Sequence, residues 1–93
     1  QCSFNFNDSN PENMRSLFDI YQEEANSLID KKLTYPALDF VLKCSHCFNL
    51  LDARGVISVT DRAQYIEKIR KLARDVASSW LEERDLLGYP LNT

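Results

Sequence analysis

The residues best suited to chemistry stand together at Cys44, His46 and Cys47. Zinc prefers four thiolate or imidazole ligands in a tetrahedron. On a helix, Cys44 and Cys47 share a face, but His46 projects about 100° away from Cys47, and Cys2 would have to come from the far end of the chain. A second CxxC or HxxxH pair is missing, as is the strand–helix setting of a thioredoxin-like motif. The pattern therefore favours small core cysteines beside a half-exposed histidine.

His46 is the one histidine of the chain, and histidine is the side chain most often used as a general acid or base. No nucleophile or paired carboxylate in the sequence is placed to use it, and there is no Gly-rich phosphate loop. We therefore expect no catalytic, cofactor-binding or metal-binding residue in this chain.

Composition predicts one small domain built from a few long elements. The chain has 93 residues, of which 44% are hydrophobic and 27% charged, with only two Gly and three Pro. The net charge of −3 gives no overall attraction to nucleic acid, and no apolar run approaches the roughly 20 residues of a membrane span. Three cysteines without a disulfide pattern indicate a reducing, cytoplasmic setting. Because the only Met is internal, we expect a piece of a longer protein.

Hydrophobic periodicity predicts an extended arm and three helices. Residues 1–10 begin with a period-2 alternation, and Asn10 followed by Pro11 is a helix start. Helical stripes then predict helices from about Pro11 to Lys32, from about Pro36 to Ala53, and from a cap at Ser58 or Thr60 to about Leu87. The second helix is apolar on more than one side, so we expect it to be central. The predicted fold is all-α, a three-helix antiparallel bundle at 11–93 with a short extended N-terminal arm at 1–10.

The sequence predicts a set of local contacts at the connection between the second and third helices, which we call the clamp. Gly55 is placed to end the second helix in the left-handed conformation, and Ser58 to cap the third. Arg54 is expected to bond the last helix carbonyls, and Asp52 to cap the turn or to pair with Arg62. A contact of Asp52 and Arg54 with another domain is the alternative.

The third helix carries an uneven distribution of charge. Its first part is basic and its last part acidic, the reverse of what the helix dipole favours. Three interpretations stay open: a solvated face, a surface for an acidic protein partner, and a contact with nucleic-acid phosphate. The basic residues are Arg62, Lys68, Arg70, Lys71 and Arg74. We place Trp80 with Tyr65 in the core, since an exposed Trp80 would instead mark a docking face.

One stretch resembles a known family closely. Residues 48–55 read FNLLDARG, followed by ISVT at 57–60 and by Arg62. This run resembles a signature near the end of the α subunit of glycyl-tRNA synthetase, in the bacterial form that assembles with a separate β subunit. YQEEA at 21–25, the YI..IR.LA pattern at 65–73 and LLGYPL at 86–91 are similar to further family segments in the same order.

The resemblance implies a class II enzyme that activates glycine with ATP, with magnesium expected beside it, and attaches glycine to tRNA. It also implies an upstream catalytic domain, to which residues 1–10 would be the linker, and an α2β2 assembly. Within it, this segment would be the C-terminal accessory helical domain, which packs against the catalytic domain or the β subunit and is not catalytic alone. Contact with tRNA would come through the full enzyme. The alternative is a stand-alone helical protein-interaction module.

Overall fold

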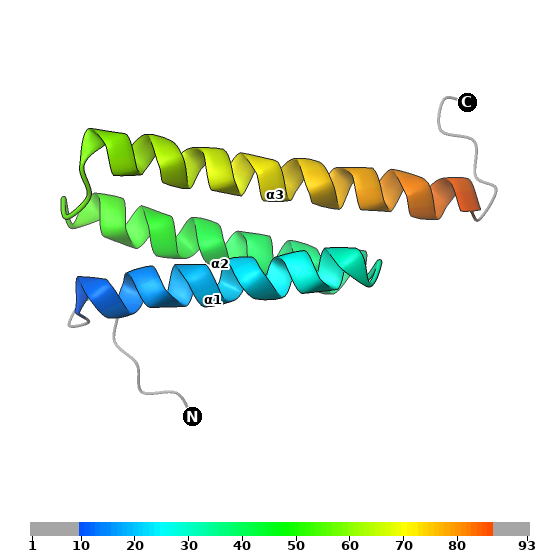
Figure 1. Ribbon diagram of the computed structural model, residues 1–93, viewed down its shortest axis with the longest axis horizontal. Helices are drawn as coiled ribbons and strands as arrows, with labels where there is room; N and C mark the ends of the chain where they lie inside the picture. The colour runs from blue at the N-terminus through cyan, green and yellow to red at the C-terminus, as the bar shows by residue number, and fades with distance from the viewer. Residues whose placement is uncertain (1–9, 87–93) are drawn as a thin grey trace.

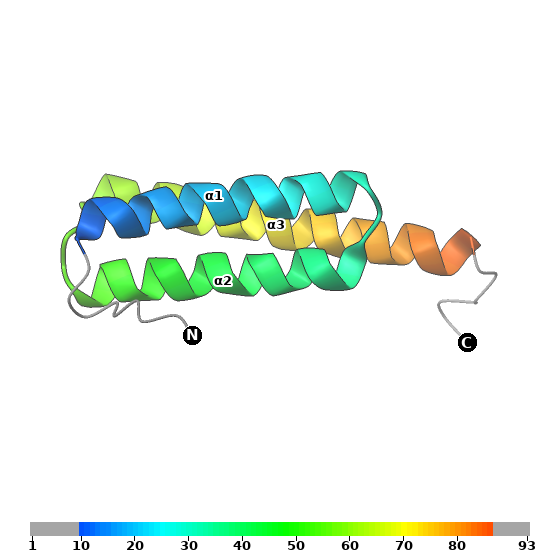
Figure 2. The ribbon, with the colours of Figure 1, turned by 90° about the horizontal axis from the view of Figure 1, so that it is seen from below.

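Three antiparallel helices form the protein, and the computed structural model describes residues 10–86 of the chain. They are α1 (Pro11–Asp30), α2 (Thr34–Ala53) and α3 (Val59–Leu86), and each runs antiparallel to the one before it (Figures 1 and 2). The predicted all-α three-helix bundle is confirmed. The predicted extended arm at 1–10 lies, except for Asn10, outside the described residues. At the other end, α3 is 28 residues long against 20 each for α1 and α2, and it projects past the α1–α2 turn.

Side-chain caps fix where two of the helices begin, as the sequence predicts. The Oδ1 atom of Asn10 accepts the N–H of Glu12 at 2.7 Å, with Pro11 at the first helical position. The Oγ atom of Ser58 accepts the N–H of Asp61 at 3.0 Å. Asp61 therefore lies in the first turn of α3, where the helix dipole favours a negative charge.

The turn between α1 and α2 differs from the prediction. Helix α1 ends at Asp30, and α2 begins two residues before Pro36. Lys32 adopts a left-handed φ of 63°, and its N–H donates to the carbonyl of Ile29 at 3.0 Å, while the N–H of Leu33 donates to the carbonyl of Leu28 at 2.9 Å. This pair of bonds closes the last turn of α1. Pro36 stays in the first turn of α2, where its missing N–H breaks no helical hydrogen bond.

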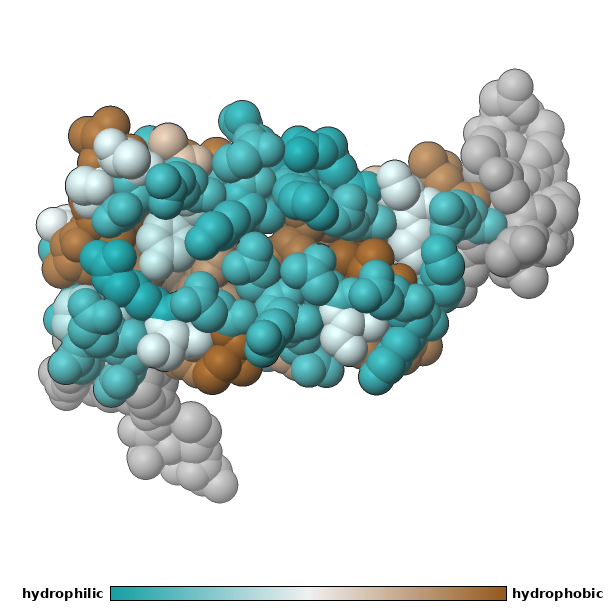
Figure 3. All heavy atoms as spheres, viewed as in Figure 1, coloured by the Kyte–Doolittle hydropathy of each residue, from teal (hydrophilic) through white to brown (hydrophobic). Residues whose placement is uncertain are grey.

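The core lies along α2, which contacts both other helices, as predicted. Most of its contact is with α1, less is with α3, and the α1–α3 contact is the smallest. Figure 3 shows the face that α1 and α3 share as mainly hydrophilic, with hydrophobic surface in the furrow between them. The buried hydrophobic side chains are Met14, Phe18, Ala25, Ala37, Val41, Cys44, Cys47, Phe48, Leu51, Tyr65, Leu72 and Val76.

The prediction that Trp80 lies in the core with Tyr65 is wrong. Tyr65 is buried as expected, in edge-to-face contact with Phe18 at 4.7 Å between ring centroids, but Trp80 is 36% exposed. Tyr65 lies where all three helices are packed together, whereas Trp80 lies beside the first turn of α2, near the end of the α1–α2 pair. There α3 has fewer neighbours to cover it.

None of the three described helices combines the length with the apolar content that crossing a membrane requires.

The left-handed residue at Lys32 gives a test of the turn. A left-handed conformation costs a residue with a Cβ about 1 kcal/mol that glycine does not incur. Lys32→Gly and Lys32→Ala both remove the exposed ion pair between the Lys32 Nζ atom and Glu82 at 2.6 Å. The glycine variant should therefore exceed the alanine variant in free energy of unfolding by about 1 kcal/mol in urea titrations. Equal stabilities for the two variants would contradict the left-handed turn.

Candidate functional site

The α2–α3 connection holds the residues of the predicted clamp together. Gly55 adopts a φ of 67°, and its N–H donates to the carbonyl of Asp52 at 3.0 Å. The carboxylate of Asp52 accepts the Nε–H of Arg62 at 3.2 Å, so the expected pairing of these two side chains is present. The N–H of Arg54 donates to the carbonyl of Leu50 at 3.2 Å. Bonds from the Arg54 guanidinium to helix carbonyls stay a prediction.

Arg15 on α1 also belongs to this connection, and the sequence analysis did not find it. The Nη2 atom of its guanidinium donates to the carbonyl of Val56 at 2.8 Å, and the Nη1 atom lies 3.8 Å from the carboxylate of Asp61. Arg15 thus ties α1 to both the link and the first turn of α3. In the sequence, Arg15 lies off the apolar stripe of α1 among polar residues, as a solvated arginine would, so no local signal marks its role.

Tyr65 lies close to Arg15 and helps to bury it. Burial raises the pKa of the Tyr65 hydroxyl, and the charge and hydrogen bond of the Arg15 guanidinium counteract that rise. Tyr65 is therefore neutral at physiological pH. Its ring also lies 5.6 Å from the Lys68 Nζ atom, a cation–π contact on the outer side of α3.

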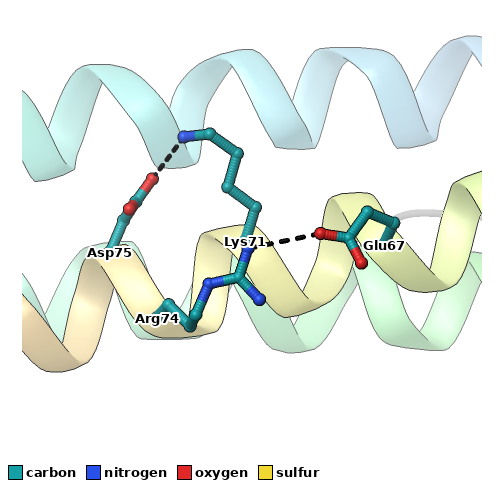
Figure 4. A network of polar contacts seen from close by, with 4 residues as sticks. All are labelled: Glu67, Lys71, Arg74 and Asp75. Carbon is teal, nitrogen blue, oxygen red and sulfur yellow. Dashed lines mark hydrogen bonds and ion pairs between the residues drawn. The ribbon is translucent and has the colours of Figure 1, made fainter.

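The basic residues of α3 mostly contact groups of their own chain. The Lys71 Nζ atom lies 2.7 Å from the carboxylate of Asp75, and the Arg74 guanidinium lies 3.3 Å from that of Glu67. Figure 4 shows how these four side chains lie along α3. Exposed pairs of this kind contribute about 0–1 kcal/mol each and can be exchanged for the groups of a partner. Arg70 is exposed and has no ion pair with the side chains described between residues 10 and 82. A partner-facing role for this row stays a prediction.

The cysteines are buried in the core. The Sγ atom of Cys44 lies 3.8 Å from the carbonyl oxygen of Phe18, facing α1. Burial raises the pKa of Cys44 to about 12 and also raises the pKa of Cys47. His46 is exposed and lines, with Cys47, a hollow of about 340 Å³ beside Tyr21. No three acidic, histidine or cysteine side chains between residues 10 and 82 gather as a metal site would require, and Cys2 lies outside that range.

The shifted thiols give a test by alkylation. At pH 8, far below a pKa of about 12, roughly one Cys44 in ten thousand is the reactive thiolate. In the folded chain, iodoacetamide should leave Cys44 and Cys47 unmodified over a time that modifies both fully in guanidinium chloride. Peptide mass spectrometry reads the result. Modification of Cys44 at equal rates in the folded and unfolded chain would show that it is accessible.

The connection gives a second test, by comparing two arginines. Arg15→Met removes a partly buried, charged hydrogen bond from the Val56 carbonyl and should lower the free energy of unfolding by about 1.5–3 kcal/mol. Arg62→Met removes only the exposed pair with Asp52 and should cost no more than about 1 kcal/mol. Urea titrations measure both. A larger loss for Arg62→Met would refute the role assigned to Arg15.

One comparison with known proteins bears on what this bundle belongs to. The family model described as glycyl-tRNA synthetase alpha subunit matches residues 1–85 of the 93. The match spans all of α1 and α2, the connection and nearly all of α3. It makes the chain part of a tRNA synthetase, a ligase, and the alpha designation indicates that it works within a synthetase complex. The chain belongs to the glycyl-tRNA synthetase alpha subunit family.

Proposed function

We propose that this chain is the C-terminal accessory helical domain of a glycine–tRNA ligase alpha subunit. In this proposal it packs against the catalytic domain of its own subunit, against the β subunit, or against both. The full cytoplasmic enzyme, a class II synthetase assembled as α2β2, binds ATP with magnesium and attaches glycine to tRNA. The helical domain contributes assembly and no catalytic group.

Exposed apolar surface along α2 is the observation that supports this role. Tyr35, Leu38 and Leu42 follow one another at i, i+3 and i+7, so they lie on one face of the helix. Tyr35 is 73% exposed and Leu42 is 60% exposed. Trp80 and Leu81 add exposed apolar surface on α3. Apolar side chains gathered on one face mark a surface that another protein covers.

A stand-alone protein-interaction module would use the same surface. The family match favours the synthetase, because it names a subunit and covers 85 residues. The two proposals differ in the partner, since only the synthetase domain should bind the β subunit or the catalytic domain.

Binding and activity measurements test the proposal together. The purified chain should retain the β subunit or the isolated catalytic domain in a pull-down, and alone it should show no glycine-dependent ATP–pyrophosphate exchange. The reconstituted full synthetase serves as the positive control for exchange. Circular dichroism should show that the chain used is helical.

Two results would count against the proposal. Failure to bind either partner would remove the docking role. Glycine-dependent exchange by the chain alone would show that it carries catalytic groups of its own.

A further inference from the structure

A shallow groove of about 320 Å³ lies between the first half of α2 and the second half of α3. Its floor is closed by Thr34, whose hydroxyl shares a buried hydrogen bond of 3.3 Å with Ser79. The rest of the lining is mainly apolar. The lining residues are Thr34, Tyr35 and Leu38 from α2, and Ala73, Val76, Ala77 and Trp80 from α3.

The shape of this α2/α3 groove suits a helix. Ala73 and Ala77 are one turn apart on α3 and add little bulk to that side of the groove, and Tyr35 and Trp80 supply aromatic surface beside it. From Ala73 to Trp80 is seven residues, or about 10.5 Å of helix. That is the span of an i, i+3 or i+4, i+7 row of apolar anchors on an amphipathic helix. The groove is built from two helices and offers no sheet edge to an extended peptide.

A positive charge at one end of the groove indicates that an acidic residue lies beside the apolar row of the bound helix. Arg70 lies three residues before Ala73 and seven before Ala77, so it lies on the same face of α3. It is exposed, whereas the other four members of the basic row each contact an acidic or aromatic group of their own chain. A carboxylate on an incoming helix would meet the Arg70 guanidinium there. Trp, Tyr and Arg are also the residue types that contribute most to binding between proteins.

We infer that the α2/α3 groove binds an amphipathic helix of the β subunit, with its apolar row over Ala73 and Ala77 and a carboxylate beside Arg70. The inference rests on the proposed function, which supplies the partner. The alpha designation of the family indicates a companion chain of another kind, and the exposed apolar face of α2 borders the same groove.

Substitutions at exposed alanines of α3 give a matched test. Ala77→Glu puts a charge into the groove, and Ala63→Glu puts the same charge on an exposed position of the same helix outside it. Calorimetry with the purified β subunit should show binding weakened at least tenfold by Ala77→Glu and changed less than twofold by Ala63→Glu. Arg70→Glu should weaken binding about tenfold, by setting like charges against each other. Circular dichroism confirms that each variant is folded.

The outcomes separate this inference from the proposed function. If the β subunit bound both the Ala77→Glu and the Ala63→Glu variant as tightly as the unchanged chain, the groove would not be its binding site. The docking role would still stand. If Ala77→Glu weakened binding of the catalytic domain but not of the β subunit, the groove would bind a different partner from the one inferred. Self-association of the chain in sedimentation, removed by Ala77→Glu, would show that a second copy covers it. Binding to neither partner would end both proposals.

Discussion

Three buried aromatic side chains, one from each helix, meet close to the α2–α3 connection. Tyr65 of α3 contacts Phe18 of α1 at 4.7 Å and Phe48 of α2 at 5.9 Å between ring centroids. Aromatic pairs in such tilted and edge-to-face arrangements contribute beyond the apolar area that they bury. They join α3 to the α1–α2 pair close to the α2–α3 connection. Arg15 reinforces the same end through the Val56 carbonyl and the first turn of α3.

The opposite end of the bundle is built differently. There α3 runs on past the α1–α2 turn, and a polar contact between Thr34 and Ser79 joins it to α2. The small side chains of Ala73 and Ala77 do not fill the space beside α2, so a groove remains. The same geometry explains why Trp80 is exposed rather than buried. One end is therefore held by aromatic packing, and the other leaves apolar surface open.

This arrangement fits a domain that supports assembly. The cysteines that first suggested chemistry are core residues with raised pKa values, since burial disfavours the thiolate. Three of the five basic residues of α3 pair with acidic groups of their own chain, Lys71 and Arg74 along the helix and Arg62 with Asp52 of α2. Among the apolar surfaces that the bundle leaves uncovered is the groove between α2 and α3, near Arg70. A partner that covers this surface would gain more from burying it than from exchanging exposed ion pairs.

The sequence by itself determined the helices, the cap at Asn10, the break at Gly55 and the family, because each depends on residues close together in the chain. It left Ser58 and Thr60 open as the cap of the third helix, and the hydrogen bond from Asp61 to Ser58 decided between them. It misplaced the α1–α2 turn by about two residues, since a left-handed Lys32 is not signalled by residue type as a glycine would be. Only the tertiary structure decided the roles of Arg15 and Trp80 and the existence of the groove. Those depend on which side chains packing brings together over 40 or more positions of the chain, such as Arg15 with Val56 and Thr34 with Ser79. Helical periodicity fixes which face of a helix is apolar but not how far each neighbouring helix covers it.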